Sequence, residues 1–172
     1  YRRQRQMCIR DSSITGSRLG YVIANPEIID RVKKVHDFLT VGAAAPLMEA
    51  ATVGLKFDDK YYDELAAHYA HMKEVFVGGL EKLGLKYTDP QGAYYVLVDV
   101  SEFGVKDDVK FCEWLAQYVG VAAVPGSSFF REDVHNLIRF HFAKQDDTLN
   151  EAIKRLATLK EKAMNATDVD WR

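Results

Sequence analysis

Membrane spans, disulfide frameworks and a strong net charge are all missing from this 172-residue sequence. It has no run of about 18 apolar residues, so we expect no membrane-spanning segment. Only two cysteines are present, which argues against a disulfide-rich secreted class and suits a reducing compartment such as the cytoplasm. With 23 basic and 25 acidic residues, the net charge of −2 gives no reason to expect a nucleic-acid or membrane partner.

The usual sequence signatures of metal, nucleotide and thiol chemistry are missing too. His68 and His71 lie about one helical turn apart, but no third residue completes a metal-ligand spacing. The sequence contains no G-x-x-x-x-G-K-[ST] phosphate loop. Neither Cys8 nor Cys112 has a histidine nearby in the sequence that would activate it as a nucleophile. Any chemistry must therefore rest on other residues.

The first twelve residues differ from the rest of the chain. They hold four arginines and one aspartate, so they carry a charge of +3, whereas residues 13–172 carry −5. They show no hydrophobic period, and no apolar segment follows the arginines as it would in a signal peptide. A basic arm is one interpretation. An unrelated end joined to a truncated gene is the interpretation we favour, so we leave residues 1–12 out of the fold prediction.

From Ser13 onward, hydrophobic periodicity predicts an α/β protein in which short strands alternate with amphipathic helices. The longest helix, residues 59–83, carries apolar side chains at steps of three and four, and Gly84 stands where a helix-ending glycine belongs. Inside this helix, Gly78 and Gly79 predict a bend or a close contact. The expected strands span residues 19–24, 94–100, 121–124 and 137–143, and the other helices span residues 25–39, 46–55, 107–119 and 146–165.

A polar segment, residues 12–18, stands directly before the first expected strand. It brings several hydroxyl groups, Gly16 and Arg18 together, and hydroxyls, backbone N–H groups and an arginine fork are good donors to phosphate oxygens. A polar turn with a solvated arginine explains the same residues, and from this segment alone it is the better explanation. Anion binding at Arg18 therefore needs support from another feature.

Arg139 lies at the centre of a strongly alternating strand. The large apolar residues of strand 137–143 share one face, so Arg139, His141 and Ala143 share the other. A charged group at a strand centre needs a partner, which is either an acidic side chain of the fold or the carboxylate of a ligand. The sequence leaves these two open. We expect His141 to be a packed, hydrogen-bonded histidine rather than a catalyst, and Asp99 to be a cap or turn residue.

Four segments follow one another along the chain: SITGSRLG at 13–20, PQGAYY at 90–95, VPGSSF at 124–129 and IRFHFA at 138–143. In order and spacing they resemble motifs of the fold-type-I pyridoxal-phosphate aminotransferases (class I/II, aspartate-aminotransferase type). The resemblance runs from about residue 13 to about residue 159. The stretch 36–46 most resembles the branch with kynurenine and methionine aminotransferases.

This resemblance implies an architecture and a set of ligands. Residues 13–57 would be the C-terminal remnant of the large domain that binds pyridoxal 5′-phosphate, and residues 58–172 a long connecting helix with a small α/β domain. Ser13 and Arg18 would bind the cofactor phosphate, and Arg139 the α-carboxylate of the substrate. The implied reaction transfers an amino group between an amino acid and a 2-oxo acid, in an enzyme expected to be a cytoplasmic homodimer.

One departure from the family pattern concerns the catalytic lysine. The resemblance implies a Schiff-base lysine eight residues before Arg18, where this chain has Arg10. Arginine stays protonated and serves neither as a nucleophile nor as a base, so it cannot replace that lysine. We therefore assign transamination to a longer parent enzyme and expect this chain to be inactive alone. Another reaction of the same fold, such as that of a C–S lyase, and a non-catalytic domain that retains the fold remain the alternatives.

Overall fold

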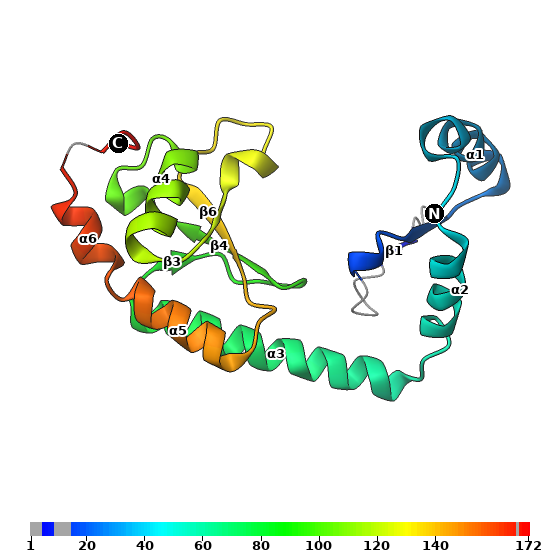
Figure 1. Ribbon diagram of the computed structural model, residues 1–172, viewed down its shortest axis with the longest axis horizontal. Helices are drawn as coiled ribbons and strands as arrows, with labels where there is room; N and C mark the ends of the chain where they lie inside the picture. Colours follow the sequence, from blue (N-terminus) through cyan, green and yellow to red (C-terminus); the bar gives the residue numbers. More distant parts are fainter. Residues whose placement is uncertain (1–4, 9–14, 168) are drawn as a thin grey trace. The chain divides into compact units, whose positions relative to one another are not determined.

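The computed structural model describes residues 5–8, 15–167 and 169–172. It consists of two compact units, Tyr1–Ala66 and Ala67–Arg172, which we call unit 1 and unit 2 and describe separately (Figure 1). The long helix α3 (Asp59–Lys82) contributes residues to both units. The domain division that we expected, between residues 57 and 58, falls just before this helix and stays a prediction.

Unit 1 contains a two-stranded sheet and two helices. Its elements are β1 (Arg5–Cys8), a 3₁₀ turn (Thr15–Ser17), β2 (Gly20–Ile23), α1 (Pro26–Thr40), α2 (Ala45–Gly54) and the start of α3. The strand and both helices after residue 18 match their sequence predictions to within a residue or two. β1 lies within the stretch that we left out of the fold prediction, and it pairs antiparallel with β2 so that Met7 stands opposite Tyr21.

The apolar side chains of unit 1 are mostly exposed. On α1, Ile28, Val32, Val35 and Leu39 recur at steps of three and four and so form one stripe, yet each is at least 41% exposed. Every buried apolar side chain among the described residues belongs to unit 2. Among the described residues, unit 1 therefore has an apolar stripe on α1 but no hydrophobic core of its own, whereas unit 2 has a core.

Unit 2 is a four-stranded sheet covered by helices. Its remaining elements are β3 (Lys86–Tyr87), β4 (Tyr95–Asp99), a 3₁₀ turn (Ser101–Phe103), α4 (Asp108–Trp114), a π-helix (Leu115–Val119), β5 (Val124–Pro125), a 3₁₀ turn (Gly126–Phe129), β6 (Leu137–His141), α5 (Asp146–Leu156) and α6 (Leu159–Asn165). The strand order is β3-β4-β6-β5, and every neighbouring pair is antiparallel. An antiparallel sheet commonly packs one face on a core and leaves the other open, and this sheet does so.

The two faces of the sheet differ sharply in burial. Val96 stands opposite Phe140 and Val98 opposite Ile138, and all four side chains are at most 4% exposed. They join one core with residues from α3, α4, α5 and α6. The predicted alternation in β6 is thus confirmed, and it places Arg139 on the opposite, open face.

Three predicted elements of unit 2 differ in detail from the structure. The expected helix 107–119 is found with nearly the same bounds, but α4 continues as a π-helix from Leu115 to Val119. The expected strand 121–124 is replaced by the short strand Val124–Pro125. The expected helix 146–165 is divided into α5 and α6. The hydroxyl of Thr158 donates to the carbonyl of Arg155 at 2.9 Å, and such side-chain bonds to the backbone compete with regular helix.

The two adjacent glycines of α3 have different surroundings. A Cβ on Gly79 would lie 2.5 Å from the side chain of Ile153 on α5, whereas a Cβ on Gly78 would meet nothing within 4 Å. The close contact predicted for this pair is therefore found at Gly79, and it lets α5 lie against α3 (Figure 1). The helix ends at Lys82, and the φ of +63° at Gly84, two residues further on, confirms the predicted role of this glycine after the helix.

These glycines form a matched pair for a stability measurement. Gly78→Ala should raise the free energy of unfolding by up to about 1 kcal/mol, because alanine favours helix. Gly79→Ala should lower it by about 1–3 kcal/mol, because β-branched Ile153 cannot move aside easily. Urea unfolding of the 172-residue chain, followed by far-UV circular dichroism, measures both. Equal effects of the two substitutions would contradict the packing, and Ile153→Ala should relieve the cost of Gly79→Ala.

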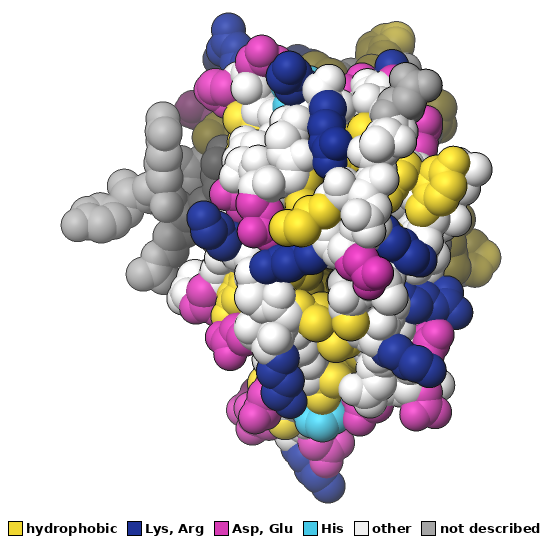
Figure 2. All heavy atoms as spheres, turned by 90° about the vertical axis from the view of Figure 1, so that its left-hand side faces the viewer, with side chains coloured by type: hydrophobic (Ala, Val, Ile, Leu, Met, Phe, Trp, Pro, Cys, Tyr) yellow, Lys and Arg dark blue, Asp and Glu magenta, His cyan; other side chains and the backbone are white. Residues whose placement is uncertain are grey.

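Basic and acidic side chains are mixed on the surface seen in Figure 2, and hydrophobic side chains appear between them in small groups. This agrees with a chain whose 23 basic and 25 acidic residues nearly cancel. None of the described helices is long and apolar enough to span a membrane.

Candidate functional site

The two arginines singled out by the sequence lie in different units, so each is described in its own surroundings. Arg139 belongs to β6 of unit 2, and Arg18 precedes β2 in unit 1. Ser13 and Arg10 lie outside the described residues, so their predicted roles stay predictions.

Arg139 is held between two aromatic rings. Its Cζ atom is 3.7 Å from the centre of the Phe129 ring and 4.2 Å from the centre of the Tyr95 ring. No described Asp or Glu lies within ion-pair distance of its guanidinium group. The sequence left open an acidic side chain or a ligand as the partner of this charge, and the described residues do not supply the acid.

Tyr95 is supported by a small aromatic stack. The rings of Tyr94 and Tyr95 are 4.5 Å apart, and Tyr94 stacks on Tyr69 of α3 at 5.8 Å. The preceding turn is tied to the same helix, since Lys73 Nζ donates to the carbonyl of Pro90 at 2.7 Å. The segment 90–95, recognised as a motif in the sequence, therefore places a tyrosine ring on the guanidinium.

Phe129 reaches Arg139 from the other side through the turn Gly126–Phe129. This turn lies directly on the start of β6, because a Cβ on Gly126 would be 2.3 Å from the carbonyl oxygen of Leu137. Only glycine allows so close an approach of two backbones. The pairing of Val124 with Arg139 fixes the register just before the turn.

This arrangement suits recognition of a carboxylate. Aromatic rings over the faces of a guanidinium stabilise the cation and leave its N–H donors pointing outward in the plane. Two of those donors can bind the two oxygens of a carboxylate side by side. The side chain of Arg139 is half-buried on the open face of the sheet, where a ligand can reach it.

Arg18 lies immediately after the 3₁₀ turn Thr15–Ser17, and its side chain is exposed. Its φ of +54° is in the left-handed region, which non-glycine residues rarely adopt and which costs on the order of 1–3 kcal/mol. A Cβ on Gly16 would meet nothing within 4 Å, so the turn is open on that side. An exposed guanidinium beside an open turn fits an anion such as a phosphate.

Two other residues noted in the sequence, Asp99 and His141, can now be placed in the structure. Asp99 accepts hydrogen bonds from the N–H of Ser101 at 2.9 Å and from the amide of Asn136 at 3.2 Å, which confirms its predicted turn role. His141 is exposed, so the prediction of a packed histidine was wrong. Desolvation of its ring, together with the positive charges of Lys144 and Arg139, lowers its pKa.

Cysteine and metal chemistry find no support among the described residues. Burial and the nearby carboxylate of Asp108 raise the pKa of Cys112 to about 12, so this thiol is a poor nucleophile at neutral pH. No group of three or more His, Cys, Asp or Glu is arranged to hold a metal ion in the part of the chain that the structure describes.

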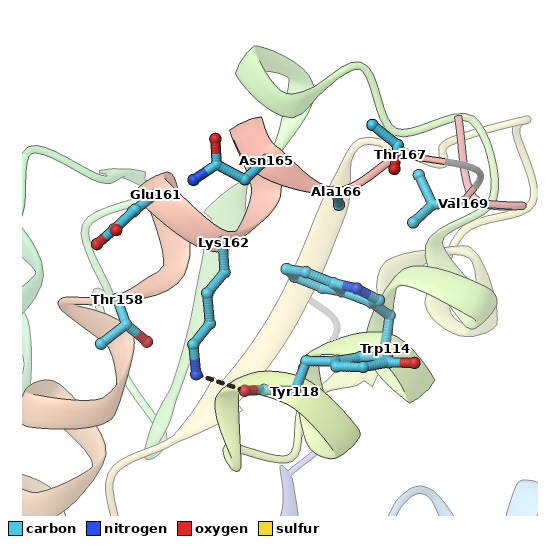
Figure 3. A pocket seen from close by; sticks show the side chains of 9 residues that line it. All are labelled: Trp114, Tyr118, Thr158, Glu161, Lys162, Asn165, Ala166, Thr167 and Val169. Atoms are coloured by element: carbon cyan, nitrogen blue, oxygen red, sulfur yellow. Dashed lines mark hydrogen bonds between the residues drawn. The ribbon is translucent and has the colours of Figure 1, made fainter.

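One hollow of unit 2 lies away from Arg139. It has a volume of about 640 Å³ and lies beside α6. Figure 3 shows Trp114 and Tyr118 on one side of it and Lys162 on the other. Lys162 Nζ donates to the carbonyl of Tyr118 at 2.6 Å. None of the site residues predicted from the sequence lines it, so its size does not make it the functional site.

The sequence prediction did not assign Tyr95 and Phe129 to the site. Both belong to recognised motifs, but strand alternation alone does not say which loop residue reaches a given face. The register of β4 and β5 against β6 supplies that information, because it sets Leu97 and Val124 on either side of Arg139.

An antiparallel sheet covered by helices on one face, with an arginine stacked between two aromatic rings on the other, defines unit 2 as a small α/β domain. The family described as aminotransferase class I and II matches residues 10–156, and the chain belongs to this family. The resemblance found in the four sequence motifs is therefore confirmed. The match begins within the stretch where the sequence departs from the family pattern.

The chain is similar to several curated and solved aminotransferases. It is 37% identical over 147 residues to methionine aminotransferase from Escherichia coli, covering 85% of this chain and 38% of that one. It is 30% identical to a probable kynurenine–oxoglutarate transaminase from Saccharomyces cerevisiae, covering 86% of this chain and 38% of that one. The structure of N-succinyldiaminopimelate aminotransferase from Mycobacterium tuberculosis superposes with a TM-score of 0.77 at 33% identity, covering 84% of this chain and 38% of that one.

Two consequences follow from these similarities. The predicted fold class, an α/β part of a fold-type-I aminotransferase, is confirmed. The chain spans only about two fifths of the length of these relatives. Its relatives include methionine and kynurenine aminotransferases, as the sequence suggested, together with aspartate and N-succinyldiaminopimelate aminotransferases.

Proposed function

We propose that this chain is part of a longer enzyme that transfers amino groups between an amino acid and a 2-oxo acid. The observation that carries the proposal is the guanidinium of Arg139, held between Phe129 and Tyr95 without an acidic partner among the described residues. Both substrates of such a reaction carry a carboxylate beside the reacting carbon, and Arg139 would bind it. Membership of the aminotransferase family supports this assignment.

The cofactor implied by the family, pyridoxal 5′-phosphate, fits one part of this chain and not another. The exposed guanidinium of Arg18 beside the open turn suits the phosphate, and Ser13 would add a hydroxyl donor. The covalent anchor does not fit, because Arg10 stands where the resemblance requires a lysine. When bound, the cofactor supplies an electron sink for bond breaking at the amino-acid α-carbon. The 172-residue chain lacks the lysine that would move the proton.

The wider setting of the enzyme is also part of the proposal. We propose a homodimer, by resemblance to the family, in which the exposed apolar stripe of α1 is covered in the longer protein. We propose the cytoplasm as its compartment, which the free, buried thiol of Cys112 suits.

Two alternatives are distinguishable from transamination. A C–S lyase of the same fold would split its substrate into a thiol, ammonia and a 2-oxo acid without needing a second 2-oxo acid as acceptor. A non-catalytic domain would do neither. Consumption of an amino acid that depends on an added 2-oxo acid, measured with the longer protein, therefore separates all three.

The test begins with the coding sequence upstream of Ser13. We expect it to encode a lysine eight residues before Arg18, in frame with the rest of the chain. After borohydride reduction with pyridoxal phosphate, the longer protein should carry one stable adduct per chain at that lysine and should turn over substrate. The 172-residue chain should show neither, because Arg10 cannot form the adduct.

A variant of the 172-residue chain provides the control. Arg10→Lys restores the amine without restoring the rest of the cofactor site, so we again expect no stoichiometric adduct. A stoichiometric adduct at a specific lysine of the 172-residue chain would contradict its proposed inactivity. An upstream sequence without that lysine would instead support the non-catalytic alternative.

A further inference from the structure

A buried carboxylate lies behind the loop that carries Phe129. Asp108 is the first residue of α4 and is fully buried, the one charged side chain in that state among the described residues. Its neighbour Asp107 caps the helix by accepting from the N–H groups of Val109 and Lys110. Asp108 is therefore not needed as the cap, and its two oxygens face other partners.

The partners of Asp108 come from two different loops. One oxygen, Oδ2, accepts from the N–H of Ser127 at 2.8 Å, and the other, Oδ1, is 2.9 Å from Nδ1 of His135. Burial acts to raise the pKa of Asp108, but the hydrogen bonds from Ser127 and His135 outweigh it and lower that pKa. The buried group is thus an ionised carboxylate satisfied by these two loops.

His135 is placed between two carboxylates. Its Nε2 atom is 2.7 Å from Oδ1 of Asp133, while its Nδ1 atom faces Asp108. A neutral imidazole has only one N–H, so donation to both carboxylates requires the doubly protonated ring. The hydrogen bonds to Asp108 and Asp133 accordingly raise the pKa of His135.

The two loops held by Asp108 flank Arg139. Ser127 is in the turn Gly126–Phe129, whose last residue places its ring 3.7 Å from the guanidinium carbon. His135 stands two residues before β6, the strand that carries Arg139. A single carboxylate therefore joins the loop that supplies the ring to the loop that leads into the arginine strand.

We propose that Asp108 is a positioning residue for Arg139: by holding Ser127 and His135 together, it keeps the Phe129 ring on the guanidinium and so orients its N–H donors toward a carboxylate. The functional meaning of this role rests on the proposed binding of substrate by Arg139. The positioning itself is a property of unit 2 and needs neither cofactor nor turnover to be measured.

The position of Phe129 should depend on pH. The charged groups that face His135 among the described residues are Asp108 of α4 and Asp133 of its own loop. Because the pKa of His135 in the folded chain is raised, its hydrogen bonds to both carboxylates are complete at pH values below its ordinary pKa of about 6.5. One of these hydrogen bonds is lost as the pH rises through the raised pKa of the folded chain, when one ring nitrogen loses its proton.

The experiment measures the side-chain protons of Arg139 by NMR in the labelled 172-residue chain. Rings stacked on the guanidinium shift the δ-proton resonances upfield. In Asp108→Asn this shift should fall by about half or more as the Phe129 ring leaves the cation. The pH-dependent step of the shift, present in the unsubstituted chain, should disappear in both Asp108→Asn and His135→Gln. In the longer enzyme, Asp108→Asn should raise KM about tenfold with little change in kcat.

The control is Asp99→Asn, which removes a carboxylate that also accepts from a backbone N–H and a side-chain amide but does not contact the turn 126–129. It should leave the Arg139 resonances and their pH step unchanged. If folded Asp108→Asn and His135→Gln behave like this control, the positioning role is wrong. If Asp108→Asn does not fold, His135→Gln alone decides. Failure of the longer enzyme to catalyse transamination would not change the conclusion about positioning, because the resonances report only the geometry around Arg139.

Discussion

Arg139→Ala in the longer enzyme is expected to lower kcat/KM for its amino-acid substrates on the order of 10²-fold. A bidentate arginine makes two charge-assisted hydrogen bonds to a carboxylate, each contributing at least about 1.5 kcal/mol. Their loss, about 3 kcal/mol in all, corresponds to a factor of this size because each 1.36 kcal/mol is tenfold in rate. Steady-state kinetics with several amino acids and one 2-oxo acid measure the effect.

Two further substitutions test whether the planar guanidinium itself, rather than its charge alone or its position on β6, is needed. Arg139→Lys keeps the charge but offers a point donor instead of a planar fork, so it should recover only part of the loss. His141→Gln changes the exposed neighbour on the same face of β6 and should alter kcat/KM by less than about threefold. If Arg139→Ala costs no more than His141→Gln, the carboxylate does not bind at Arg139. Circular dichroism of each variant checks that unit 2 stays folded.

Trp171→Ala is expected to lower the free energy of unfolding of unit 2 by about 3–5 kcal/mol, as removal of a large buried aromatic side chain commonly does. Trp171 is fully buried, with its ring 5.1 Å from that of Phe111 and 5.4 Å from that of Trp114. Its backbone carbonyl also accepts from the N–H groups of Lys106 and Asp107, and these bonds survive the substitution. The loss therefore reports side-chain packing. Urea unfolding followed by far-UV circular dichroism measures it.

The indole of Trp171 gives this experiment its matched control. Its Nε1 atom is buried and has no hydrogen-bond partner among the described residues, and such a donor costs about 1–3 kcal/mol. Trp171→Phe removes this donor together with some packing, so it should destabilise by less than about 1.5 kcal/mol. Met164→Ala, at a side chain 75% exposed, should have almost no effect. Similar losses in Trp171→Ala and Trp171→Phe would contradict this account.

The sequence predicted most elements because they depend on local periodicity. The apolar stripe of α3 and the alternation of β6 follow from the repeats of 3.6 and 2 residues, and both were confirmed. Boundaries were less certain where side chains compete with the backbone, as at Thr158 between α5 and α6. The family was also readable from the sequence, since the spacing of four short motifs does not depend on packing.

The candidate site was predicted only in part. The sequence identified Arg139 and the face on which it lies, because alternation fixes faces. It left open what balances the charge, since that depends on which residues of distant loops come near. Folding pairs β6 with β4 and β5, which brings the rings of Tyr95 and Phe129, but no described acidic side chain, to the guanidinium.

By itself, then, the sequence determined the fold class, the family and the absence of a lysine at position 10. Those properties can be derived from the order of residues along the chain alone. Only the tertiary structure decided that Arg139 is stacked between aromatic rings and that a buried carboxylate, Asp108, joins the two loops beside it. Asp108 and Ser127 are 19 residues apart in sequence. Their contact exists because α4 lies against β5 and the turn 126–129 in the folded domain, and no local pattern encodes it.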